Sequence, residues 1–300
     1  MIQFIKKQRI PGLLFLAFLG SIIFFGITYL YPMEWPSQEV RIIRNFGWND
    51  EGRPSLGNTF LAEGPIRAAD KGELIFYHSP SNPASVLPSP LGFWVALEHG
   101  DGIIGIYSRF EVDTNPSFPD IIDKDVVVGS AGQSGWTNQE GFYFSLFDRR
   151  ERRWVNPSTI IAPFEDTMPP QIQSVVLKND RNNQIDLSQA KTIRQGRYTI
   201  LVAASDTRLN SNETPLAPYR IVCSVNGSEI GVLTFETFST RDGVLMVYRN
   251  SLVPVRQIYS LDPVFEIGEV EFMRGQATLT VIAQDITGNV RNNVYRFLVE

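Results

Sequence analysis

Short runs in which apolar and polar residues alternate make up most of this chain. Val, Ile, Phe, Tyr and Thr recur at every second position, whereas the apolar spacing of long helices is scarce. Such alternation buries one side of a strand and leaves the other in water. Together with 23 glycines and 19 prolines, residues that favour turns, the pattern predicts a mainly β protein.

One segment near the N-terminus breaks this pattern. Residues 10–33 contain no charged side chain, and residues 13–31 are almost continuously apolar. About 20 helical residues, at roughly 1.5 Å each, span a hydrocarbon core of roughly 30 Å. Because basic residues precede the segment, residues 1–9 are expected in the cytoplasm and the rest of the chain outside it. A cleaved signal peptide is the alternative, but the small-x-small cleavage pattern is missing, which favours an uncleaved signal anchor.

The part of the chain after this segment is acidic. The sequence has 27 Lys and Arg against 32 Asp and Glu, and leaving out the three basic residues before the segment leaves 24 against 32, about −8. A surface of this charge is unsuited to nucleic acid, whose backbone requires cationic partners. We therefore expect no nucleic-acid partner.

Two domains are expected beyond the membrane segment. Residues 38–163 form the first, and residues 164–170, with paired prolines, form a linker. Residues 171–300 show strands about 8–12 residues apart between Asn-, Gly- and Asp-rich turns, the pattern of a β-sandwich. Their Pro-Pro-x-Ile and Asp-x-x-Gly-Asn motifs resemble immunoglobulin- or cadherin-like modules.

Two segments of the second domain share the pattern G-x-x-T-(I/L)-x-V-x-A-x-D. They are residues 196–206 and 275–285, and each is expected to form a strand between a glycine and an aspartate. Calcium binding at Asp206 or Asp285 is one interpretation, but neither is expected in a cluster of acids, so turn formation is favoured. The single cysteine, Cys223, is expected to be a buried thiol without a redox role.

The first domain carries a series of glycine and apolar motifs. They lie at Leu91–Phe110, Val126–Gly135, Gly141–Asp148 and Val155–Pro157. The series resembles the M23 (LytM-type, duplicated-hybrid-motif) zinc endopeptidases, which cut peptidoglycan cross-links and carry I-x-H-x-x-G, Y-A-H-L, G-x-H-L-H-F-E and V-N-P. The resemblance implies a LytM/M23-like antiparallel β domain.

The metal-binding letters of the resembled family are replaced. The alignment puts Ser55 and Thr59 on the first His and Asp ligands, Arg109 on the His of Y-A-H-L, and Tyr143 and Ser145 on the two histidines of H-L-H. We call these five residues the vestigial groove. Hydroxyls are poor zinc ligands at neutral pH, and arginine offers only donors. The sequence therefore predicts no catalytic residue, no metal and no cofactor.

The two histidines of the chain lie outside these positions. His99, with Gly102, matches a family turn and is expected to be structural, while His78 follows a strand into a Ser-Pro loop. A zinc site rebuilt from them is not favoured. The basic run Arg149–Arg153 is expected to be a solvated turn, with a contact for an acidic partner as the alternative.

Three functions follow from this resemblance. The first is a catalytically inactive M23 peptidase-like protein in the bacterial inner (cytoplasmic) membrane, with its two domains in the periplasm or extracytoplasmic space. It would bind peptidoglycan or regulate a cell-wall hydrolase, because degenerate family members activate wall amidases by protein contact. The alternatives are an active zinc-dependent cell-wall endopeptidase and a structural or adhesive envelope scaffold.

Overall fold

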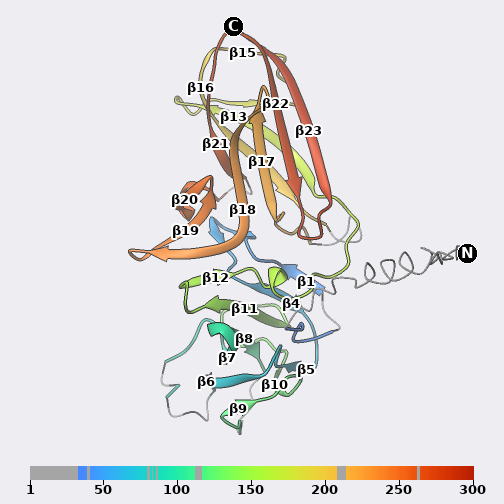
Figure 1. Cartoon of the computed structure of the whole chain (residues 1–300), viewed down its shortest axis with the longest axis vertical. Helices are drawn as coiled ribbons and strands as arrows, with labels where there is room; N and C mark the ends of the chain where they lie inside the picture. Colours follow the sequence, from blue (N-terminus) through green and yellow to red (C-terminus); the bar gives the residue numbers. More distant parts are fainter. Residues whose placement is uncertain are drawn as a thin grey trace, which may run out of the picture. The chain divides into compact units, whose positions relative to one another are not determined.

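The structure is a computed structural model of the 300-residue chain (Figure 1). Residues 32–300 form one compact unit, and the strands that fill it confirm the mainly β prediction. The structure describes residues 33–38, 41–79, 82, 84–85, 87–111, 117–207, 214–261 and 264–300.

The predicted cytoplasmic stub and membrane segment cannot be compared with this structure. Residues 1–9 lie outside the described residues, and so does the 10–33 segment apart from Met33. Among the residues that are described, no helix has the length and apolar character needed to cross a membrane.

The first half of the described chain is built from short antiparallel strands. In β11, alternation places Phe142, Phe144 and Leu146 in the core and turns Tyr143 to the other face. The elements are β1 (Arg41–Arg44), β2 (Asn49–Asp50), β3 (Arg53–Pro54), β4 (Asn58–Leu61), β5 (Pro65–Arg67), β6 (Gly72–His78), β7 (Phe93–His99), η1 (Gly100–Gly102), β8 (Ile103–Phe110), β9 (Ile121–Ile122), β10 (Val127–Ser130), β11 (Phe142–Asp148), β12 (Arg153–Val155) and η2 (Pro157–Thr159).

A central sheet carries the motifs of the first half. Its strands run in the order β11-β8-β7-β6-β9, and β4 and β12 pair with successive parts of the free side of β11. Strands β5 and β10 form a separate two-stranded sheet. The core of this half is made of side chains from both sheets, among them Phe60, Ile66, Leu97, Tyr107, Val128 and Phe144.

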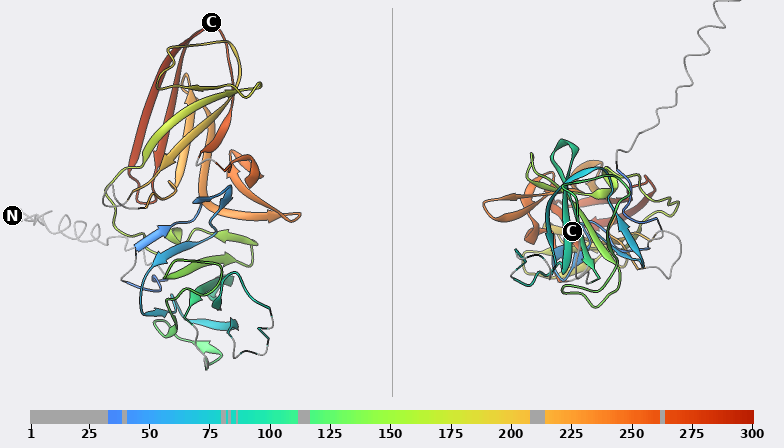
Figure 2. Two further views of the ribbon diagram at one scale, coloured as in Figure 1. Left: turned by 180° about the vertical axis from the view of Figure 1, so that it is seen from behind. Right: turned by 90° about the horizontal axis from the view of Figure 1, so that it is seen from below.

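The second half forms two sheets around another core (Figure 2). One sheet runs β14-β13-β16-β21, and the strands β23-β22-β17-β18 belong to the sheet on the other side. The elements are β13 (Gln171–Asn179), β14 (Gln184–Asp186), β15 (Thr192–Ile193), β16 (Gly196–Ser205), β17 (Arg220–Val225), β18 (Ser228–Arg241), β19 (Val244–Arg249), β20 (Ser251–Pro254), η3 (Val255–Gln257), β21 (Phe265–Phe272), β22 (Gly275–Gln284) and β23 (Val290–Val299).

Several local predictions for the second half are confirmed. The two segments of shared pattern form β16 and β22, and each strand ends directly before its aspartate. The Asn-Gly pair within the sequence Val225–Ser228 predicts a hairpin, and Asn226 and Gly227 both have positive φ in the turn between β17 and β18, as a type I′ hairpin requires. Cys223 is fully buried, and burial raises the pKa of its thiol to about 12, which makes it unreactive. The immunoglobulin-like topology remains a prediction.

Backbone pairing joins the two halves. Strand β12 pairs antiparallel with β18, placing Trp154 opposite Phe238, and a hydrogen bond from the Asn156 amide to the Glu236 carbonyl extends the ladder. From the other side, Phe46 of the first half packs in the core of the second. The ladder therefore continues from the central sheet into the sandwich.

Candidate functional site

A row of cross-strand neighbours crosses the central sheet on the face opposite its core. Thr59 in β4 pairs with Tyr143 in β11, and Tyr143 with Ser108 in β8. Ser108 pairs with Trp94 in β7, and Trp94 with His78 in β6. Directly opposed residues share a face of a sheet, so this row forms the surface on which the predicted vestigial groove lies.

Three hydroxyl side chains meet in this region. The phenol of Tyr143 is hydrogen-bonded to the side chains of Ser145 and Ser55, and the hydroxyl of Ser55 donates to the carbonyl of Gly57 at 2.7 Å. Burial raises the pKa of Tyr143 to about 12, and these hydrogen bonds and the charge of Arg109 only partly oppose that effect. We call Ser55, Tyr143 and Ser145 the hydroxyl cluster.

The segment that carries Ser55 lies in direct contact with β11. A Cβ atom added to Gly57 would lie 2.4 Å from the carbonyl oxygen of Phe144, 2.6 Å from Cβ of Ser145 and 2.8 Å from Cζ of Tyr143. No real side chain tolerates such distances. The hydroxyl cluster is thus closed on this side by backbone, and a glycine is needed for the contact.

Arg109 lies beside the hydroxyl cluster on an irregular part of β8. The register with β7 shifts at this point, and Arg109 has φ 71°, a left-handed conformation that is unusual for a residue other than glycine. Its guanidinium carbon lies 5.5 Å from the ring centroid of Tyr143, a cation–π contact. Burial lowers the pKa of Arg109, and the neighbouring Tyr143 opposes this. The bulge re-aims the arginine side chain toward the phenol.

These side chains are a poor fit to zinc. Serine hydroxyls are not deprotonated at neutral pH, and a pKa of about 12 keeps the Tyr143 phenol protonated as well. Arg109 adds a positive charge and only hydrogen-bond donors. Thr59 is buried opposite Tyr143 and adds another hydroxyl. The five predicted positions therefore lie together, but their donor set favours hydrogen bonding over metal coordination.

His99 is part of the core of the first half. Its Nδ1 lies 3.0 Å from the carbonyl oxygen of Lys71 and its Nε2 3.1 Å from the hydroxyl of Tyr107. Burial lowers the pKa of His99, which favours the neutral ring. Directly after it, η1 ends at Gly102, whose φ of 77° suits a glycine turn.

His78 lies at the other end of the same strand pair. The β6–β7 register places Gly72 opposite His99 and Trp94 opposite His78, so the two histidines are separated by the length of the ladder. Nε2 of His78 is 2.9 Å from the carbonyl oxygen of Leu87. The two imidazoles therefore cannot hold one metal ion together.

The basic run forms the turn between β11 and β12. Arg149 pairs with Glu98 at 2.7 Å and Arg150 with Asp101 at 3.4 Å, and all of these side chains are in contact with solvent. Two of the arginines are thus already paired with acidic side chains of the same chain. This arrangement favours the solvated turn over a basic docking site.

Sequence reasoning missed a pocket at the edge of the central sheet. It has a volume of about 530 Å³, and none of the five vestigial-groove residues lines it. Two adjacent aromatic pairs, one at the end of β6 and one at the start of β7, are the sequence signal that was available. We call it the aromatic pocket and define it by Tyr77, His78, Phe93, Trp94, Glu111 and Phe118.

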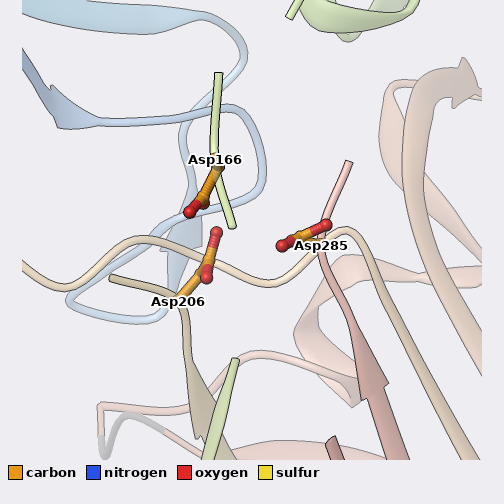
Figure 3. Close-up of side chains that lie close together, drawn as sticks. All are labelled: Asp166, Asp206 and Asp285. Carbon is orange, nitrogen blue, oxygen red and sulfur yellow. The ribbon is translucent and has the colours of Figure 1, made fainter. Parts of the chain in front are cut away.

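Three aspartates come together beside the ends of β16 and β22 (Figure 3). Carboxylate oxygens of Asp166, Asp206 and Asp285 all lie within 4.8 Å of one another. The expectation that Asp206 and Asp285 lie in no cluster of acids is therefore wrong, because the fold gathers acids that are far apart in sequence. Asp285 also has the predicted turn role, since its carboxylate accepts hydrogen bonds from Thr287 and Asn289.

Comparisons with known proteins match parts of this chain. A protein-family model matches residues 169–300, which is less than half of the chain. No curated protein matches the chain.

Several solved structures of M23-type domains are similar to it. The catalytic domain of the M23 protein EnpA from Enterococcus faecalis has 20% identity and a TM-score of 0.35, covering 42% of this chain and 95% of its own. The SpoIIQ–SpoIIIAH pore-forming complex gives 16% identity and 0.35, covering 43% and 90%. Lysostaphin from Staphylococcus simulans gives 14% identity and 0.32, covering 72% and 86%. With TM-scores below 0.5, these matches are a likeness and do not identify a function.

Proposed function

We propose that this chain is a membrane-anchored, catalytically inactive M23 peptidase-like protein of the bacterial cell envelope. It binds peptidoglycan, or regulates a cell-wall hydrolase, through the face of the central sheet that carries the vestigial groove. The anchor is the apolar segment at residues 10–33, which places both halves of the protein on the outer side of the inner membrane.

The observation that carries this proposal is the hydroxyl cluster. A metallopeptidase needs deprotonated ligands that hold zinc and leave a position for an acidified water. At the corresponding positions the phenol of Tyr143 is hydrogen-bonded to Ser55 and Ser145, and Tyr143 keeps its proton because of its burial. Protonated hydroxyls that hydrogen-bond within the protein are poor ligands for zinc, which supports a binding role over hydrolysis.

Arg109 is the residue that we expect to recognise the ligand. It stays protonated at neutral pH and lies beside the row of side chains that crosses this face of the central sheet, with its guanidinium carbon 5.5 Å from the ring centroid of Tyr143. A guanidinium forms strong, paired hydrogen bonds with carboxylates. Stem peptides of peptidoglycan and acidic surfaces of partner proteins both offer such groups.

The first test is metal content and hydrolysis. The full-length protein, purified in mild detergent and supplied with zinc, is expected to retain far less than one equivalent after dialysis and to leave peptidoglycan uncut. An active peptidase from the same family serves as the positive control. One tightly held zinc per chain together with shortened cross-links would establish the endopeptidase alternative instead.

The second test separates binding from a passive scaffold. Purified peptidoglycan sacculi and a solubilised envelope extract are each offered to wild type, Arg109→Glu and Arg152→Glu. Arg152 is the matched control because it is an exposed arginine that also has a left-handed backbone, with φ 54°. Arg109→Glu is expected to reduce capture at least about fivefold, the effect of roughly 1 kcal/mol. Equal capture by all three proteins would favour the scaffold.

A further inference from the structure

The aromatic pocket has walls of a distinctive kind. Tyr77 and Phe118 form one edge-to-face pair with centroids 5.7 Å apart. His78 stacks on Trp94 at 6.4 Å and on Phe93 at 6.3 Å. Its volume of about 530 Å³ is that of an ordinary small-ligand site. Aromatic faces carry negative potential, so such walls attract a cation.

The charge of the pocket points the same way. Among the residues that the structure describes, Glu111 is the only acid that lines it, and no described lysine or arginine does so. Glu111 is exposed, and among the described ion pairs none involves it. An anionic ligand would be repelled by Glu111, whereas a cation would meet in Glu111 a carboxylate that has no described ion-pair partner.

His78 contributes a further acceptor to this environment. Its Nε2 faces the carbonyl oxygen of Leu87, which can only accept a hydrogen bond, so the contact selects the tautomer with the proton on Nε2. Nδ1 then carries a lone pair; this atom is itself buried, and it has no hydrogen-bond partner among the described residues. Trp94 in the same wall carries an indole N–H, which only donates, so the charged acceptor that an ammonium group would meet here is the carboxylate of Glu111.

We propose that the aromatic pocket binds the organic ammonium group of a ligand, such as a primary amine at the end of an aliphatic chain. The methylene groups would pack on Phe118 and Tyr77, and the ammonium would lie near Glu111. This inference does not rest on the proposed function, because none of the vestigial-groove residues lines the pocket.

The test compares two probes that differ only in the charged group. Nα-acetyl-lysine methylamide and Nα-acetyl-norleucine methylamide are titrated into the full-length protein, and binding is followed by calorimetry. The lysine probe is expected to bind about tenfold more tightly, which corresponds to roughly 1.4 kcal/mol. Glu111→Gln is expected to remove most of that difference and to leave the norleucine probe unchanged.

Two controls make the outcome decisive. Glu140→Gln changes an exposed glutamate outside the pocket and is expected to leave both affinities as in wild type. Phe118→Ala is expected to weaken both probes, and its melting temperature shows whether it folds. Equal affinity for the two probes, unaltered selectivity in Glu111→Gln, or binding of N-acetylglucosamine but not of the lysine probe up to about 10 mM would each overturn the proposal.

Discussion

The hydroxyl cluster and the aromatic pocket lie in the same half of the molecule but are built on opposite principles. In the cluster, Tyr143 hydrogen-bonds Ser55 and Ser145, and backbone at Gly57 covers them. In the pocket, aromatic faces and Glu111 line an open cavity of about 530 Å³. The first region satisfies its polar groups internally, and the second leaves acceptors available to a ligand.

The region to which the family motifs point and the region with an open cavity are therefore two different places. The motifs that resemble a peptidase lead to the hydroxyl cluster, where the phenol of Tyr143 is hydrogen-bonded to Ser55 and Ser145, so we expect these side chains to contribute to the stability of the fold. The pocket takes wall residues such as Trp94 and Val128 from two of the same motifs, but its chemistry is visible only once the ends of β6 and β7 are brought together. If this contrast is right, changes in the cluster should affect stability and changes in the pocket should affect binding.

The largest effect is expected from adding one methyl group inside the cluster. Gly57→Ala places Cβ well inside contact distance of Tyr143 and Ser145, so unfolding by urea should show a loss of about 3 kcal/mol. Gly100→Ala is the matched control, because a Cβ there meets nothing within 4 Å. A stability loss of similar size in both variants would contradict the tight contact.

A smaller effect is expected from alkaline pH. The pKa of Tyr143 is raised from its ordinary value of 10 to about 12, so the folded state holds this proton more tightly than the unfolded state. The resulting stability is complete below about pH 10 and is lost as pH rises toward 12, by up to about 2 kcal/mol. Denaturation at pH 9, 10 and 11 should show a shallower decline in Tyr143→Phe than in wild type. Identical declines would mean that the phenol is not buried as described.

The smallest effect is the loss of one hydroxyl at neutral pH. Tyr143→Phe removes the shared partner of Ser55 and Ser145, which should cost about 1–2 kcal/mol in urea denaturation. Binding of the lysine probe should be unchanged in this variant, since the phenol does not line the aromatic pocket. A weakened probe affinity would show that the two regions are coupled.

Structural features made by residues close together in the sequence could be predicted, whereas contacts between residues far apart in the sequence could not. Period-2 alternation and the Asn226-Gly227 turn are local, so β16, β22 and the β17–β18 hairpin could be predicted. The vestigial-groove positions came from motif spacing, which fixes register along a strand. Their hydrogen bonds could not be foreseen, because they depend on the close approach of Gly57 to β11.

Features made by distant segments escaped prediction. Asp166 precedes β13, whereas Asp206 and Asp285 follow the ends of β16 and β22, and only the folded chain brings the three together. Likewise, Glu111 and Phe118 join the aromatic pocket from a different connection than Tyr77. Nothing in local composition encodes such convergence.

The pairing of β12 with β18 has a consequence for recognition. An exposed strand edge presents free amides and carbonyls to which another polypeptide can add a strand, and it is a common starting point for aggregation. Here the outer edge of β12 is occupied by the chain's own β18. A partner that binds near Trp154 must therefore recognise side chains, because no free backbone edge is available there. The same pairing prevents a second copy of the protein from adding a strand at this edge.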